Sequence, residues 1–98
     1  MNIKDGAVLS GLDIRMRQAL LIADEIYNDH GQDLTITCGL DGSHGAGSFH
    51  YYGLAIDLRT RFFTDSEKTI VYSELVRMLD SNYRVIFENT HFHIQIKI

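Results

Sequence analysis

The chain has 98 residues, of which 45% are apolar and 22% charged, a composition typical of one folded globular domain. Its formal net charge of -4 argues against a nucleic-acid-binding protein, which would carry a basic stripe. No window approaches the roughly 18 apolar residues of a membrane span, and the N-terminus lacks the basic start and apolar core of a signal peptide. We therefore expect a protein that is cytoplasmic where it is synthesised. Cys38 is the only cysteine, so no internal disulfide is expected.

The first half of the chain predicts a helix, two strands and a loop between the strands. Apolar residues recur at intervals of three and four over residues 12–28, which predicts an amphipathic helix ending near Gly31. Alternation over residues 34–38 predicts a strand. Four glycines among residues 39–47 predict a loop, and residues 53–58 predict the second strand.

The second half predicts a helix followed by a hairpin. Thr64 and Glu67 have the spacing of a capping box, so a helix should begin there and extend to about Leu79. Two strands, residues 83–88 and 91–98, should then pair through a two-residue turn. Because side chains alternate across a strand, one face of the hairpin is apolar and should pack on the helices. The other face collects polar side chains, and Ile86 is its one apolar member. Its residues are Arg84, Ile86, Glu88, His91, His93 and Gln95.

This polar face suggests part of a metal site. Zinc in catalytic sites takes imidazole nitrogen and carboxylate oxygen and keeps one position open for water. His50 and Asp57 are separated by a turn and a short strand, so a histidine from the hairpin would complete a set of two imidazoles and one carboxylate. Glu88 on the same face could then accept a proton from the water. The alternative is a plain α+β scaffold whose histidines are solvated on the sheet.

Two motifs carry a resemblance to a known family. Residues 48–57 have the form S-x-H-x-x-G-x-A-x-D, and residues 91–93 have the form H-x-H. Together they resemble the zinc peptidases of the D-alanyl-D-alanine carboxypeptidase family, and equally the Hedgehog signalling domain that shares their fold. The resemblance covers residues 34–98, about two thirds of the chain. It implies an α+β fold with a small antiparallel sheet, two helices packed on one face and a zinc site on the other.

The resemblance also implies roles for individual residues. His50, Asp57 and His93 match the zinc ligands, His91 matches a residue that stabilises the transition state, and Glu88 lies near the position of the catalytic glutamate. In relatives whose acid precedes the ligand by three residues, the ligand would instead be His91. We favour His93 because residues 94–96 continue the strand as in the family.

Three other positions bear on the site. His44 falls where Hedgehog-like members carry another active-site histidine. Asp41 stands where carboxypeptidases of the family hold a substrate-binding arginine, a role that Arg59 or Arg61 could fill unless they are simply solvated. Cys38 could be a soft metal ligand, although in a short strand it is more often a buried small hydrophobic residue.

The sequence therefore predicts a zinc metallopeptidase that hydrolyses peptidoglycan stem or cross-bridge peptides, as a carboxypeptidase or an endolysin-like endopeptidase of bacterial or phage origin. The alternative is a Hedgehog-like binding module with a structural zinc and no hydrolytic activity. The sequence does not determine the oligomeric state.

Overall fold

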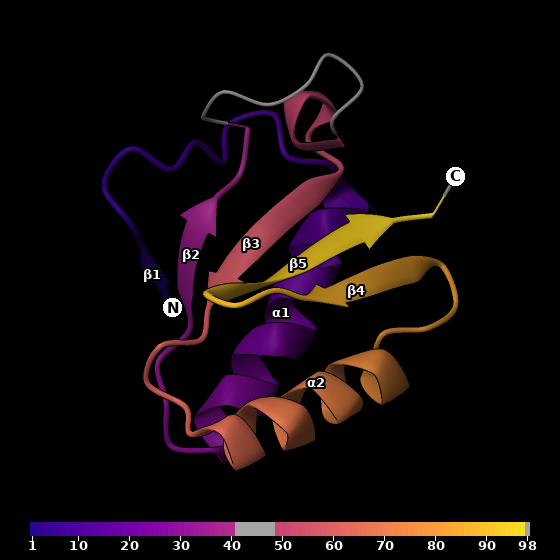
Figure 1. The fold of residues 1–98 in the computed structure, drawn as a ribbon. Coiled ribbons are helices and arrows are strands. Elements are labelled where there is room, and N and C mark those ends of the chain that lie inside the picture. Colours follow the sequence, from indigo (N-terminus) through magenta and orange to yellow (C-terminus); the bar gives the residue numbers. More distant parts are fainter. Residues whose placement is uncertain (41–48, 98) are drawn as a thin grey trace.

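Within the residues that the structure describes, five strands form one sheet, and two α-helices share a hydrophobic core with it. The computed structural model describes residues 1–40 and 49–97 (Figure 1). The elements in chain order are β1 Asn2–Ile3, α1 Ile14–Asp29, β2 Thr35–Cys38, the 3-10 helix η1 Phe49–Tyr52, β3 Ala55–Arg59, α2 Asp65–Met78, β4 Tyr83–Phe87 and β5 His91–Ile96. The fold class is α+β, as the sequence predicts.

The strands lie in the order β1-β2-β3-β5-β4, which makes β3 the central strand. All pairs are antiparallel except β1 with β2, which is parallel. The predicted antiparallel sheet is therefore found, and β1 adds one parallel pair at its edge, so the whole sheet is mixed. The sequence does not reveal β1 because it has only two residues, both exposed, and so shows no alternation of apolar and polar side chains.

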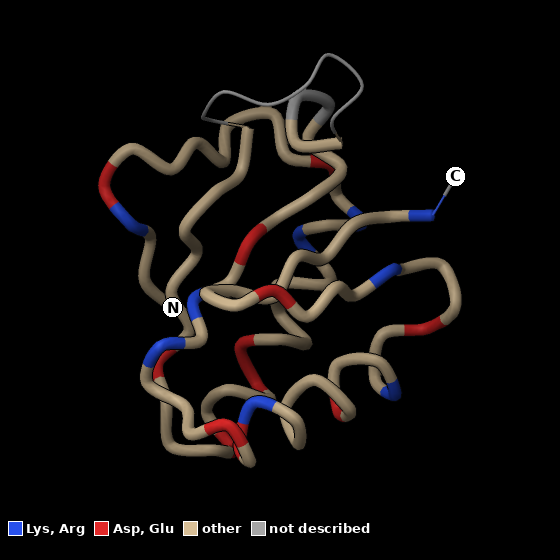
Figure 2. The backbone as a smooth tube through the Cα atoms, viewed as in Figure 1, with Lys and Arg blue, Asp and Glu red and all other residues tan. Residues whose placement is uncertain are grey.

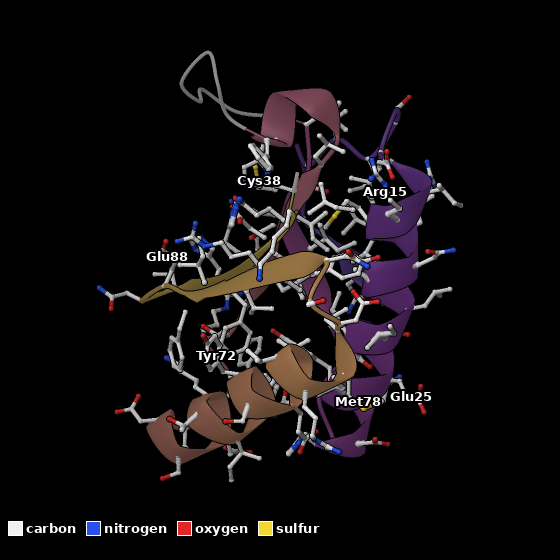
Figure 3. The ribbon with its side chains drawn as sticks, turned by 90° about the vertical axis from the view of Figure 1, so that its right-hand side faces the viewer. Arg15, Glu25, Cys38, Tyr72, Met78 and Glu88 are labelled. Atoms are coloured by element: carbon white, nitrogen blue, oxygen red, sulfur yellow. The ribbon has the colours of Figure 1, made fainter. Side chains whose placement is uncertain are left out.

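The hairpin of β4 and β5 has the predicted register. Ile86 faces His93, and the Glu88 amide donates to the His91 carbonyl across the turn. The apolar side chains of β5 are buried in one cluster with residues of β3 and both helices, so both helices pack on the same face of the sheet. That cluster includes Met16, Leu20, Ile56, Leu58, Val71, Leu75, Phe92, Ile94 and Ile96. Figure 3 shows Cys38 and Glu88 on the side of the sheet away from α1.

Both helices begin at side-chain caps. The Thr64 hydroxyl accepts from the Glu67 amide while the Glu67 carboxylate accepts from the Thr64 amide, which confirms the capping box. Asp13 caps α1 by accepting from the Arg15 amide at 2.8 Å. The Asp13 amide in turn donates to the Gly53 carbonyl at 3.0 Å, so the start of α1 contacts the turn that follows η1.

Candidate metal centre

Two neighbouring elements, η1 and β3, and the distant strand β5 bring His50, Asp57 and His93 together. His50 lies on η1, Asp57 is in the middle of β3, and His93 is its direct partner on β5. His50 Nε2 lies 3.2 Å from His93 Nδ1 and 3.4 Å from Asp57 Oδ1. His93 Nδ1 lies 2.9 Å from the same carboxylate oxygen. Two imidazole nitrogens and one carboxylate oxygen therefore converge on one point.

The remaining nitrogen of each imidazole has a partner of its own. His50 Nδ1 lies 2.8 Å from the Gly39 carbonyl oxygen, and His93 Nε2 lies 2.8 Å from Gln95 Oε1. These oxygens only accept, so both nitrogens carry hydrogen. Metal-binding histidines in proteins donate their second N–H to an oxygen in the same way, which fixes the ring and directs the other nitrogen at the ion. The donor set and its orientation fit a metal ion such as zinc.

The electrostatics of the cluster also favour a cation. Burial raises the pKa of Asp57, but hydrogen bonds from His50 and His93 outweigh it and hold that pKa well below its ordinary range. Burial disfavours the charged His93 ring, yet hydrogen bonds to Asp57 and Gln95, with the charge of Glu88, raise its pKa. In the metal-free protein an ionised carboxylate is thus paired with an imidazole that readily takes a proton. A metal ion would compete with that proton for the same place.

The sequence leaves Cys38 open between a soft metal ligand and a buried small hydrophobic residue, and the structure places it beside His50 and Asp57. It is half-buried, and its Sγ lies 3.8 Å from His50 Nδ1. Cys38, His50 and Asp57 each offer a ligand atom within 4.8 Å of the others, so this cluster could hold a metal ion. A regular ladder would place Cys38 opposite Ile56 on the helix side, but a register shift after Ile36 places it opposite Asp57. No pattern in the sequence marks that irregularity.

The two proposed catalytic residues of the hairpin lie at the edge of the cluster. His91 Nε2 is 3.7 Å from Asp57 Oδ1, and its Nδ1 is 3.0 Å from the Thr90 hydroxyl. Glu88 is exposed at the end of the hairpin, and its charge contributes to the raised pKa of His93. His44, the third residue proposed for catalysis, lies outside the described residues.

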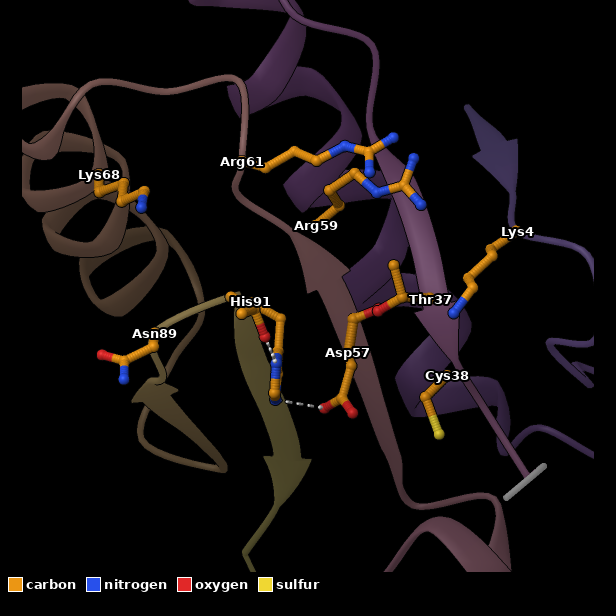
Figure 4. Close-up of a pocket in the computed structure, with 10 residues that line it drawn as sticks. Lys4, Thr37, Cys38, Asp57, Arg59, Arg61, Lys68, Asn89 and His91 are labelled. Atoms are coloured by element: carbon orange, nitrogen blue, oxygen red, sulfur yellow. Dashed lines mark hydrogen bonds and ion pairs between the residues drawn. The ribbon is translucent and has the colours of Figure 1, made fainter. Parts of the chain in front are cut away.

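The cluster opens into a cavity of about 590 Å³, shown in Figure 4. Asp57 and His91 line it, joined by the ion pair drawn there. The side chains of Thr37 and Cys38 from β2 form the opposite wall. A regular ladder would already place Thr37 opposite Asp57, and the register shift adds Cys38 to the same side. Of the three residues of the centre, Asp57 lines this cavity, so a ligand in it would reach the centre beside that carboxylate.

No protein-family model matches this sequence, and no curated protein matches it. Among the helices in the described part of the chain, none has the length and apolar character needed to cross a membrane. The fold class and a side-chain cluster able to hold a metal ion thus rest on the structure itself.

Proposed function

We propose that this protein is a zinc-dependent peptidase whose ligands are His50, Asp57 and His93. The observation that carries the proposal is the convergence of His50 Nε2, His93 Nδ1 and Asp57 Oδ1 within 3.4 Å of one another. Two imidazoles and one carboxylate are a ligand set of catalytic zinc sites, which leave a fourth position for water or substrate. The cavity that Asp57 lines supports the proposal, because a substrate held in it would lie beside the proposed zinc ligand.

Zinc in such a site supplies Lewis acidity, polarising a carbonyl and lowering the pKa of a coordinated water to about 7. The chain supplies the proton transfers. Glu88 is two residues beyond Ile86, which faces His93, so its carboxylate is on the same face and can accept the proton of an attacking water. It then returns that proton to the leaving amine. His91 Nε2, next to Asp57 and open to the cavity, is placed to donate to the oxyanion that develops on the scissile carbonyl.

The substrate class rests on the family resemblance that the two motifs carry. That resemblance predicts hydrolysis of peptidoglycan stem or cross-bridge peptides. The decisive experiment is to incubate zinc-loaded protein with purified peptidoglycan and identify the released fragments by mass spectrometry. Glu88→Gln should bind zinc and fold as the wild type does, while its rate falls by about 10²- to 10⁴-fold, the usual contribution of a general base.

Glu25→Gln is the matched control, because Glu25 is an exposed acid on α1, remote from the hairpin. Its rate should equal that of the wild type. If Glu88→Gln cleaves peptidoglycan at the wild-type rate, Glu88 is only a solvated acid and the mechanism above is wrong.

The position of Cys38 favours one second candidate, a binding module of the Hedgehog type with a structural zinc. If the thiolate joined the ligand set, four protein ligands would close the site, as in structural zinc centres. Such a protein would bind zinc stoichiometrically but release no fragment from peptidoglycan. The same incubation, with the zinc content measured in parallel, separates the two candidates.

A further inference from the structure

Cations gather around the cavity beside the candidate metal centre. Of the nine Lys and Arg residues in this acidic chain, four line it: Lys4, Arg59, Arg61 and Lys68. Asp57 is the one carboxylate among the described residues that line the same cavity, and it is engaged with histidines. Figure 2 shows acidic and basic positions mixed along α2.

Within the described part of the chain, none of these four cations forms an ion pair with Asp or Glu. Arg61 lies over the ring of Phe62 at 5.1 Å, a contact that leaves its charge uncompensated. Figure 4 shows the side chains of Arg59 and Arg61 extending in the same direction. Like charges held near each other repel, so an anion bound between them would be stabilised.

One of the cations, Arg59, is also in register with the candidate centre. Asp57 pairs with His93, and the next pair on the same face is Arg59 with His91. Residues two apart on a strand are separated by about 7 Å, the length of two residues of an extended peptide. A peptide held with its scissile bond at Asp57 and His93 would therefore place an adjacent side chain near Arg59.

We propose that this cavity is a substrate subsite for an acidic peptide segment carrying two or more carboxylates. The proposal rests on the peptidase function above and names the part of the substrate beside the scissile bond. In Figure 4, Lys4 and Lys68 lie on opposite sides of the two arginines. Charges spread across an open cavity of about 590 Å³ suit carboxylates spaced along a chain better than one compact anion.

The test measures binding and not cleavage. The probe is a fluorescently labelled peptide with alternating glutamate and alanine, and the reference peptide has glutamine at each glutamate. Fluorescence anisotropy is recorded with zinc-loaded Glu88→Gln protein, so that neither peptide is consumed. The acidic peptide should bind about tenfold tighter than the reference at low salt, and the difference should shrink at 1 M salt, where the Debye length is only about 3 Å.

Arg59→Gln and Arg61→Gln should each weaken the binding of the acidic peptide by about two- to fivefold and leave the affinity for the reference peptide unchanged. Arg77→Gln removes an exposed cation from α2 that does not line the cavity, so it should have no effect. Equal binding of the two peptides would overturn the proposal, as would an equal loss in Arg77→Gln. Binding of a short oligonucleotide in preference to the acidic peptide would also overturn it. If the acidic peptide binds preferentially but the wild-type protein releases no fragment from peptidoglycan, the subsite is retained and the peptidase function is rejected.

Discussion

Cys38 lies opposite Asp57 on the neighbouring strand, although Ile36, two residues earlier, lies opposite Leu58. This irregularity gives the site two candidate ligand sets that share His50 and Asp57. Cys38 completes the set on the Nδ1 side of His50, and His93 completes it on the Nε2 side. Because His50 Nδ1 already donates to the Gly39 carbonyl, the set with His93 is the one in which an imidazole nitrogen of each histidine points at the Asp57 carboxylate.

Cys38→Ser should therefore retain one zinc per chain. The serine keeps the size of the side chain and loses the thiolate, which this ligand set does not need. Cobalt-substituted wild-type protein should correspondingly lack a thiolate-to-metal charge-transfer band in the near ultraviolet. Loss of zinc in Cys38→Ser together with such a band in the wild type would show that the site is closed by sulfur.

His50→Ala should lose stoichiometric zinc and the stability that zinc provides. Binding to the native state alone stabilises it by about 2.7 kcal/mol at a free zinc concentration 100 times the Kd. His30→Ala is the control, because His30 pairs with Glu74 at 3.0 Å, between α1 and α2. Elemental analysis and thermal unfolding with and without zinc should show a zinc-dependent rise in Tm for His30→Ala and none for His50→Ala.

His93 and His91 should differ in what their removal does. His93 Nδ1 lies 2.9 Å from Asp57, whereas His91 Nε2 lies at 3.7 Å and at the open edge of the cluster. His93→Ala should lose zinc, and His91→Ala should keep zinc and lose hydrolytic rate. Zinc retained by His93→Ala and lost from His91→Ala would mean that the ligand is the histidine three residues after the glutamate.

Gly53→Ala should destabilise the protein more than Gly31→Ala does. Both glycines have positive φ, +70° and +74°, which costs an L-residue roughly 1–2 kcal/mol. A Cβ at Gly53 would also lie 2.5 Å from the Gly11 carbonyl oxygen, whereas one at Gly31 meets nothing within 4 Å. Since the Gly53 amide donates to the His50 carbonyl, Gly53→Ala should weaken zinc binding as well. Urea unfolding and zinc titration of both variants test this. Equal losses of unfolding free energy in the two variants would show that the backbone near Gly53 shifts to accommodate the Cβ at little cost.

The cap of α1 should make stability fall in acid. The hydrogen bond from the Arg15 side chain lowers the pKa of Asp13 from 3.8 to about 2. The ionised Asp13 carboxylate therefore contributes fully to the free energy of unfolding above about pH 4, and this contribution is lost as the pH falls through about 2. Asp13→Asn keeps an oxygen acceptor for the Arg15 amide and has no charge to lose. Chemical unfolding at pH 5, 4, 3 and 2 should give a shallower decline for Asp13→Asn than for the wild type, and parallel declines would contradict this assignment.

The sequence predicts the parts of this fold that depend on local patterns. The spacing of apolar residues in α1, the capping box at Thr64 and the two-residue turn of the hairpin each involve neighbours in the chain, and each is found in the structure. The facing of Ile86 and His93 follows from alternation across that short turn.

The parts that the sequence does not predict depend on contacts between distant segments. The parallel pairing of β1 with β2 and the register shift at Cys38 leave no periodic signal. The sequence also does not predict that the Gly39 carbonyl accepts from His50, because every residue has a backbone carbonyl and no residue type marks this one. Gln95 shares the face of His93 by simple alternation, so its role as a hydrogen-bond partner could have been inferred.

The central position of β3 has a consequence for how the chain comes apart. An ion held by η1, β3 and β5 would join His50 to His93, 43 residues later, through a strand that lies between both halves of the sheet. Those strands could not separate until the ion left, so unfolding would wait for its release. With one cysteine the chain cannot join these strands by an internal disulfide. The ion would act as a removable crosslink, opened by a chelator and not by a reductant.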